Sequence, residues 1–265
     1  MPRSLQLLRL HLRVADLARS LRFYSTQLGF KVLRHADRRA ELGTSQDAPG
    51  LLELSEDKNA VATGPEAAGL FHGAVLLPDR GALGRWLQFA AATGAEFDGF
   101  ADHGVSEAVY LSDPDGNGLE FYADRPQADW PRESGKLTMF TRSLGVRELI
   151  AASGSVRPNP LAESRWGHLH LRVTDLIRSR AFYEAELGVT VMQDSLPGAA
   201  FLAADGYHHH LGLNTWGQPR YPKPADALGL VSATFQHPTA GNDRELAAPE
   251  GYTLELASIP GTYTA

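Results

Sequence analysis

The stretch RLHLRVADLARSLRFYSTQLGFKVL at residues 9–33 decides the fold, because it returns as HLHLRVTDLIRSRAFYEAELGVTVM at residues 168–192. The two stretches agree at 15 of 25 positions when one Leu/Met pair is counted as equivalent. Such self-similarity indicates a tandem duplication. Arg9 stands where His168 stands, so one copy alone offers a metal ligand at this position. This difference between the copies guides the search for the active site.

Each copy begins as a strand followed by a helix. LHLRV alternates as a strand does, Asp16 or Asp175 stands at the helix N-cap position, and Gly29 or Gly188 ends the helix. Three further strand candidates follow in each copy: KVLRHAD, RAELGT and LLELS in the first, and VTVMQDS, AAFLAA and HHHLGLN in the second. The repeated unit is therefore predicted to be βαβββ.

Two more units complete the chain. From Leu70, the pattern predicts a strand over 70–79, a helix over 80–94 and strands over 106–113 and 118–124, the last two joined by an Asp-Pro-Asp-Gly-Asn turn. The segment from Leu228 to Ser258 keeps two strands and has little room for a helix, so this fourth module is predicted to be truncated. We divide the chain into modules one and two (1–125), a linker with one helical stretch near 143–154 (126–165), and modules three and four (166–265).

Composition narrows the class of protein. The 265 residues are 43% hydrophobic and 9% aromatic, which is enough for a folded core. Because the chain has no cysteine, any metal must be bound by His, Asp or Glu. The net charge of -6 gives no support for nucleic acid or membrane partners. The sequence shows neither an apolar run near 20 residues nor a signal peptide, so we expect a cytoplasmic protein that acts on a small molecule.

Four βαβββ modules, with strands ending in V-x-D-L and helices ending in F-Y-x-x-x-L-G, resemble the vicinal oxygen chelate superfamily. The superfamily includes extradiol ring-cleaving dioxygenases, glyoxalases, epimerases and bleomycin- or fosfomycin-resistance proteins, so its fold alone does not give the activity. The resemblance implies an α+β fold in which the modules form two domains of curved mixed sheets. It also implies that the metal ligands come from the first strand of one module and the first and last strands of its partner.

These strand positions hold His168, His72 and Glu120. Two imidazoles and one carboxylate are the ligand set of an open ferrous site. Taken singly, each of these residues is more often structural, and it is the combination that favours a metal centre. The set joins modules two and three, which we expect to pair, leaving modules one and four as a half without metal. The fallback set is His11, His72 and Glu120.

Two segments resemble extradiol dioxygenases, most closely catechol 2,3-dioxygenases of the bacillus type. DHGVSEAVYL before SDPDGNGLEFYADRP implies that His103 and Tyr110 line the substrate pocket near the ligand Glu120. GYHHHLGLN resembles a His-His-Thr strand whose second His is the acid/base, which implies this role for His209. Since His210 stands where Thr is usual, His208 and His210 remain candidates, and a surface histidine cluster is the alternative.

The resemblance implies that Fe(II), or Mn(II) in its place, and dioxygen open a catechol-type aromatic ring beside its diol to give a muconic semialdehyde. His209 would protonate or stabilise the oxygen species, and His103 and Tyr110 would hydrogen-bond the substrate. The alternatives are a glyoxalase-like metal-dependent isomerase and a metal-free aromatic-binding or resistance protein. A homo-oligomer is compatible with the sequence. We expect Trp130, Trp166 and Trp216 to pack rather than to contact substrate.

Overall fold

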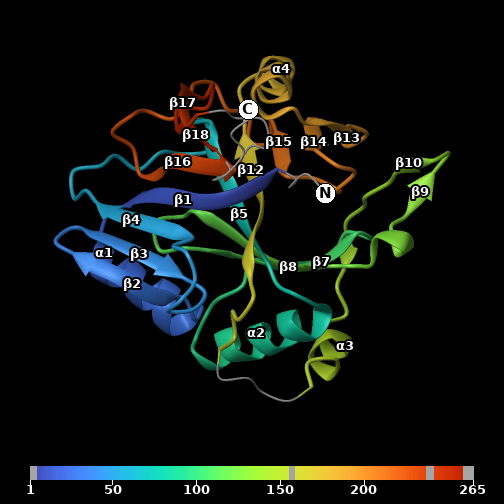
Figure 1. Ribbon diagram of the computed structural model, residues 1–265, viewed down its shortest axis with the longest axis horizontal. Helices are drawn as coiled ribbons and strands as arrows, with labels where there is room; N and C mark the ends of the chain where they lie inside the picture. The colour runs from blue at the N-terminus through green and yellow to red at the C-terminus, as the bar shows by residue number, and fades with distance from the viewer. Residues whose placement is uncertain (1–4, 155–158, 237–241, 259–265) are drawn as a thin grey trace, which may run out of the picture.

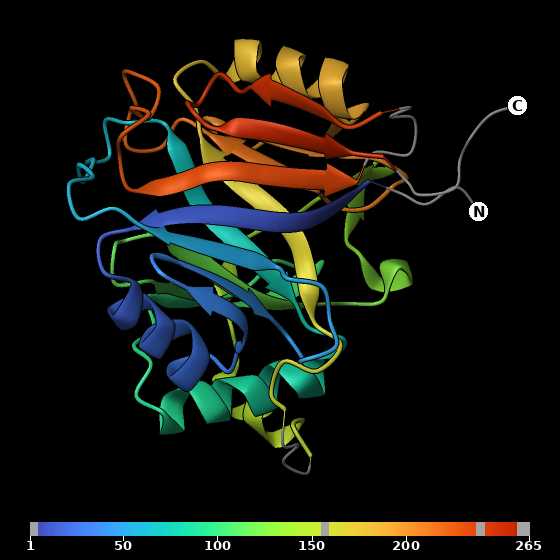
Figure 2. The same ribbon diagram turned by 60° about the vertical axis from the view of Figure 1, so that its left-hand side comes forward.

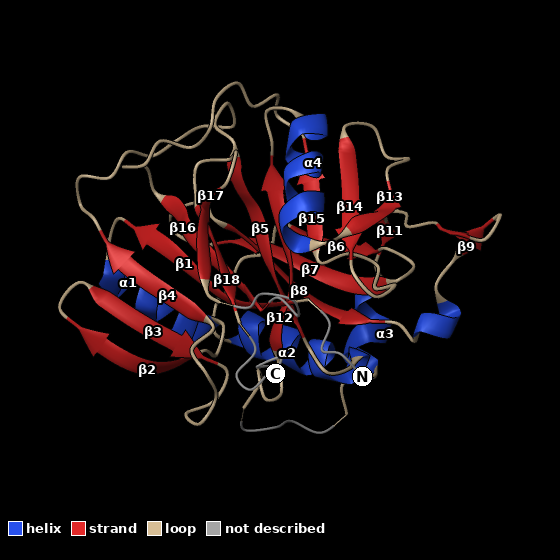
Figure 3. Ribbon diagram, turned by 45° about the horizontal axis from the view of Figure 1, so that its top comes forward, coloured by secondary structure: helices blue, strands red, loops and turns tan. Residues whose placement is uncertain are grey.

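The computed structural model describes residues 5–154, 159–236 and 242–258. Residues 1–4, 155–158, 237–241 and 259–265 lie outside the described residues. They are parts of the predicted ranges 1–125, 126–165 and 166–265. The described chain forms two large mixed sheets with helices at the periphery (Figure 1; Figure 3). This confirms the predicted α+β class built from βαβββ modules.

The first sheet joins modules one and four. Its strand order is β17-β18-β16-β1-β4-β3-β2, with β1 and β16 antiparallel at the centre. Its strands are β1 (Gln6–Val14), β2 (Lys31–Ala36), β3 (Arg39–Gly43), β4 (Leu52–Glu56), β16 (Gly229–Gln236), β17 (Arg244–Ala247) and β18 (Thr253–Ala257). Between β16 and β17 only residues 242 and 243 are described.

The second sheet joins modules two and three. Its order is β11-β6-β7-β8-β5-β12-β15-β14-β13, with β5 and β12 antiparallel at the centre. Its strands are β5 (Gly69–Leu76), β6 (Gly99–Asp102), β7 (Ser106–Ser112), β8 (Gly118–Asp124), β11 (Arg142–Ser143), β12 (Arg165–Arg172), β13 (Thr190–Gln193), β14 (Ala199–Ala203) and β15 (Leu211–Asn214). Each sheet thus takes strands from both sides of the segment 126–165.

That segment does more than connect the halves. Its strand β11 extends the second sheet beside β6, and a hairpin of β9 (Arg132–Glu133) and β10 (Lys136–Leu137) projects from the body (Figure 1). The helical stretch predicted near 143–154 is the shorter α3 (Val146–Ala151), and a 3-10 turn, η2 (Gln127–Asp129), follows β8.

The helices begin as the sequence predicts. Asp16 caps α1 (Leu17–Leu21) by accepting from the Arg19 amide, and Asp175 caps α4 (Leu176–Leu187) in the same way. Gly188 ends α4 in the left-handed conformation. The first copy differs, because α1 continues as the π-helical η1 (Arg22–Gln27). Module two contributes α2 (Arg80–Ala92).

The two sheets pack against each other over one apolar core (Figure 2). Trp166 of β12 lies in this interface and donates from Nε1 to the Leu51 carbonyl oxygen at 2.6 Å. Two further hydrogen bonds also connect the sheets. Tyr24 of η1, which follows a strand of the first sheet, donates to buried Asp113 between β7 and β8 at 2.9 Å. Tyr183 of α4, which follows a strand of the second sheet, donates to buried Glu250 between β17 and β18. No helix in the described ranges combines the length and apolar composition that a bilayer crossing requires. Side-chain packing and these hydrogen bonds therefore connect the two sheets.

Candidate metal centre

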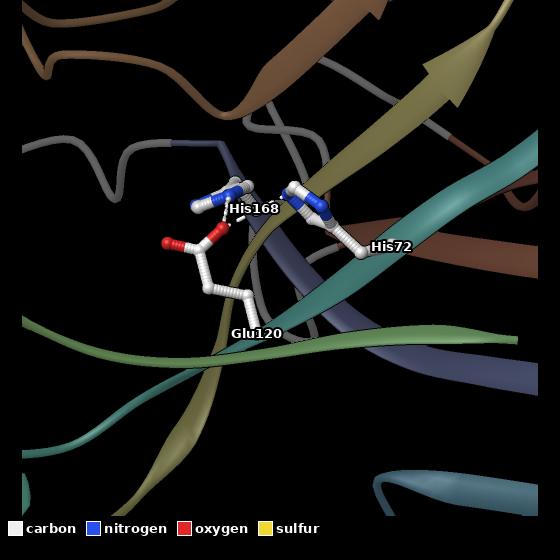
Figure 4. Close-up of side chains that lie close together, drawn as sticks. All are labelled: His72, Glu120 and His168. Atoms are coloured by element: carbon white, nitrogen blue, oxygen red, sulfur yellow. Dashed lines mark hydrogen bonds and ion pairs between the residues drawn. The ribbon is translucent and has the colours of Figure 1, made fainter. Parts of the chain in front are cut away.

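Three buried side chains converge at the middle of the second sheet (Figure 4). The Nε2 atoms of His72 and His168 lie 2.9 and 3.1 Å from the same oxygen, Oε2 of Glu120. One ligand atom from each residue lies within 4.8 Å of the others. The structure therefore brings together the three residues that the sequence singled out as ligands.

Strand register explains this convergence. Ala74 of β5 pairs with Glu120 of β8 on one side and with His168 of β12 on the other. His72 lies two residues before Ala74, so its side chain is on the same face of the strand. Because Ala74 is small, the three larger side chains can meet above it.

The protonation states fit a cation. Burial alone would raise the pKa of the Glu120 carboxyl, but the adjacent imidazoles of His168 and His72 hold it well below its usual range. Burial lowers the pKa of His168 to about 4. The cluster therefore has an ionised carboxylate and a neutral His168 at neutral pH, as metal ligands require.

One orphaned nitrogen points to the same conclusion. Nε2 of His72 is buried and, among the described residues, makes no hydrogen bond of acceptable geometry, although it lies near the Glu120 oxygen. A buried polar atom without a partner is costly unless something unseen satisfies it. Two imidazoles and one carboxylate suit a divalent ion such as Fe(II) with open coordination positions. The donor set therefore fits the predicted metal.

A pocket of about 390 Å³ opens beside the cluster. Its wall is mostly apolar and aromatic, with a few polar side chains near the three candidate ligands. The lining residues that matter below are Phe71, His72, His103, Tyr110, Glu120, Phe140, Thr141, His170, His209 and Trp216. Such a wall suits an aromatic molecule held by a small number of polar contacts.

His103 and Tyr110, both predicted to line this pocket, are hydrogen-bonded to each other. His103 Nδ1 lies 2.9 Å from the Phe140 carbonyl oxygen, which can only accept, so Nδ1 carries the hydrogen. In neutral His103, Nε2 then accepts from the Tyr110 hydroxyl at 2.7 Å. Burial and the nearby Glu120 raise the pKa of Tyr110 well above its usual value, so its hydroxyl keeps its proton. Phe140 belongs to the segment predicted as a linker, and no sequence signal pointed to it.

The three consecutive histidines have different surroundings. They precede β15, which begins at Leu211, so the strand predicted over 208–214 starts three residues later. Of the three, His209 lines the pocket, with its ring centroid 4.1 Å from that of His168. His208 is fully buried behind it, and His210 accepts from the Ala204 amide and faces a different cavity. Burial lowers the pKa of His209 well below its usual value.

Two further pocket residues are Trp216, which departs from expectation, and His170, for which the sequence predicted no role. Trp216 was predicted to pack, yet it lines the pocket, with its ring centroid 5.6 Å from that of Phe71. His170 lies beside His72, with ring centroids 4.8 Å apart, and its Nε2 accepts from the Asn214 amide at 3.0 Å. Asn214 is held in this orientation because its oxygen accepts from the Trp216 amide. Trp130 and Trp166 are buried, as predicted.

The corresponding position of the first sheet has a different chemistry. Strand register matches Glu255 of β18 to Glu120, but its neighbours are Arg9, 3.7 Å away, and Thr234, whose hydroxyl donates to it. His11 lies in this same sheet and contacts the Ser55 hydroxyl at 2.8 Å. The fallback set with His11 is therefore wrong as a cluster, because His11 and His72 belong to different sheets.

Comparisons with known proteins agree with this architecture. The profile of the Glyoxalase/Bleomycin resistance protein/Dioxygenase superfamily matches residues 6–121. A catechol-2,3-dioxygenase of Bacillus subtilis is 44% identical over 225 residues, covering 83% of this chain and 78% of the relative. The chain belongs to this superfamily. Among solved structures of the superfamily fold, glyoxalase I from Zea mays aligns with a TM-score of 0.55 and 19% identity over 96% of this chain and 92% of its own.

A further solved structure extends the likeness of fold. The cppA protein from Streptococcus pneumoniae aligns with a TM-score of 0.55 and 12% identity, covering 96% of this chain and 99% of its own. At these identities the structural likeness concerns the fold alone. The chain thus shares the superfamily architecture over almost its whole length, and its own side chains must indicate the activity.

Proposed function

We propose that this protein is an extradiol dioxygenase that opens a catechol-type ring beside its two hydroxyl groups. The observation that carries the proposal is the His72, Glu120 and His168 cluster at the end of an aromatic pocket. The similarity to a catechol-2,3-dioxygenase over most of the chain supports the same activity. The product would be a muconic semialdehyde.

His72, Glu120 and His168 would hold Fe(II), or Mn(II) in its place. Such an ion, when bound, lowers the pKa of the diol hydroxyls and activates dioxygen. The two imidazoles and the single carboxylate leave one unit of positive charge uncompensated, which favours an ionised diol. The three ligand residues come from adjacent strands, β5, β8 and β12, and the pocket beside them leaves room for substrate.

The other pocket residues would bind and orient the ring. The aromatic walls, including Phe71 and Trp216, exclude water and pack against an aromatic face. The Tyr110 hydroxyl would hydrogen-bond a diol oxygen, His103 would orient that hydroxyl, and His209 would hold or return a diol proton. Within the described part of the chain the pocket wall carries no Lys or Arg. An uncharged catechol is therefore a better substrate for this pocket than one with a carboxylate substituent.

Oxygen uptake tests the proposal. Protein loaded with Fe(II) without air receives catechol, and dioxygen consumption is recorded with the visible spectrum. We expect one dioxygen consumed for each yellow ring-opened product. Bound metal without uptake across a panel of catechols would refute the activity and favour an isomerase.

The internal repeat provides a matched pair of variants for the metal site. Glu120→Gln removes the carboxylate of the cluster, whereas Glu255→Gln makes the same change at the corresponding position of the first sheet. Glu120→Gln should lower the content of tightly bound metal, measured by elemental analysis after dialysis, and Glu255→Gln should not. Equal metal content in the two variants would contradict the assignment of the site.

A further inference from the structure

A chain of hydrogen bonds connects His209 to Asp124 at the end of β8. His209 Nδ1 lies 2.7 Å from His208 Nδ1, and His208 Nε2 lies 2.8 Å from Oδ1 of Asp124 at the end of β8. Asp124 lines a second cavity, of about 490 Å³, whereas His209 lines the pocket. His208 is fully buried between them. The proposed function gives neither Asp124 nor His208 a role.

The donors and acceptors in this chain can be assigned one by one. The Tyr207 hydroxyl donates to Oδ2 of Asp124 at 3.0 Å, and Tyr207 in turn accepts from the Tyr122 hydroxyl at 2.8 Å. An ionised carboxylate can only accept, so the contact on Oδ1 requires a hydrogen on His208 Nε2. Both oxygens of Asp124 are therefore satisfied by donors.

The hydrogen position on His209 follows from that on His208. A neutral His208 with hydrogen on Nε2 has a lone pair on Nδ1, so the short contact between the two rings requires a hydrogen on His209 Nδ1. The remaining ring nitrogen of His209, Nε2, then carries a lone pair. Since His209 lines the pocket, that lone pair is available to a bound molecule.

We propose that Asp124 and His208 are positioning residues that hold His209 in the Nδ1–H tautomer, so that Nε2 presents an acceptor to a substrate hydroxyl. The tautomer assignment depends on these hydrogen bonds with one hydrogen on each imidazole ring. The role toward a diol hydroxyl rests on the proposed function. In a direct Asp-His pair the carboxylate contacts the acid/base histidine itself. Here Asp124 contacts His208, which contacts His209, so the negative charge of Asp124 lies one ring further from the pocket.

Replacing the carboxylate by an amide should reverse the two hydrogen bonds that His208 makes, to residue 124 and to His209. In Asp124→Asn the Tyr207 hydroxyl still donates to the side-chain oxygen, which turns the amide nitrogen toward His208 Nε2. That nitrogen donates, so His208 must carry its hydrogen on Nδ1 and donate to His209 Nδ1. His209 then carries its hydrogen on Nε2 and offers no lone pair to the pocket.

Nitrogen-15 NMR of the metal-free protein reads these tautomers directly. The His209 signals are assigned by their loss in His209→Gln. We expect the Nδ1–H tautomer for His209 in the unmodified protein and the Nε2–H tautomer in Asp124→Asn. Asp205→Asn is the matched control, since Asp205 lines the same cavity but lies outside the chain of hydrogen bonds, and it should leave His209 unchanged. An Nε2–H tautomer in the unmodified protein would overturn the proposal whether or not any variant folds.

Kinetics of the metal-loaded enzyme separate this proposal from the proposed function. Asp124→Asn should lower kcat on the order of 10²-fold, the scale of a lost general base, with KM and metal content nearly unchanged. A kcat close to that of the unmodified enzyme, despite a reversed tautomer, would remove the assigned role. If the unmodified enzyme consumes no dioxygen, the proposed function fails while the NMR result still decides the tautomer.

Discussion

Gly167→Ala should destabilise the protein through collision with a single side chain, that of Tyr122. A Cβ at Gly167 would lie 1.8 Å from the Tyr122 hydroxyl oxygen, 2.6 Å from Cζ and 2.8 Å from Cε1. Gly167 is not among the glycines with positive φ, so its backbone accepts alanine and the cost must come from this collision. Overpacking costs about 1–3 kcal/mol, losing the Tyr122–Tyr207 hydrogen bond adds about 0.5–1.5 kcal/mol, and the lower entropy of unfolded alanine returns about 0.4–1 kcal/mol. The free energy of unfolding should therefore fall by about 0.5–4 kcal/mol.

Urea unfolding of Gly167→Ala, Tyr122→Phe and the double variant measures this contact. Removing the hydroxyl relieves the nearest part of the collision, so the double variant should be more stable than the sum of the single effects predicts, by about 0.5–3 kcal/mol. The internal repeat is consistent with this reasoning. Where the second sheet has Gly167 and the large Tyr122, the first sheet has the larger Leu8 and the small Ala257. Additive effects, or a fully stable Gly167→Ala, would refute the reasoning.

Two further predictions concern the pocket and the protein interior. Tyr110→Phe removes the hydroxyl that contacts His103 and would meet a diol oxygen; it should lower kcat for ring opening about 10²-fold, the scale of a lost group at the reacting hydroxyl, in oxygen-uptake assays where an unchanged kcat would exclude the role. Burial raises the pKa of Glu250, so the folded protein keeps this proton to a higher pH than the unfolded chain does. Stability should therefore fall as pH rises above the usual glutamate pKa, by up to about 1.4 kcal/mol per pH unit, until the folded pKa is passed. Glu250→Gln should remove this part of the slope in urea unfolding measured at several pH values, and identical slopes would contradict it.

The repeat made most of the architecture predictable. Its strand, N-cap and glycine signals place the βαβββ modules because each signal is local: Asp175 caps a helix wherever the helix lies. The absence of a histidine at Arg9 also favoured the pairing of modules two and three, which is the pairing that the sheets have. The resemblance to the vicinal oxygen chelate superfamily then supplied the strand positions at which His72, Glu120 and His168 were predicted as ligands.

Contacts between distant segments could not be predicted in this way. Phe140 reaches His103 only because β11 joins the edge of the second sheet, and a two-residue strand has no sequence pattern of its own. Asp124 is the last residue of the strand that carries Glu120, and its sequence position does not reveal its partner His208. Trp216 is half exposed beside the pocket, a position that its residue type does not distinguish from packing.

The pairing of the outer modules with each other has a consequence for synthesis of the chain. Strand β1 ends at Val14, yet its neighbour β16 begins at Gly229. One edge of β1 must therefore stay unpaired until β16 has been translated, and pairings of such long sequence separation form slowly. His72, Glu120 and His168 all precede β16 in the chain, so their cluster includes no residue of β16. Under the proposed function, a chain truncated before β16 would carry the full ligand set while one edge of β1 stays unpaired, and metal retention would be a poor indicator of complete folding.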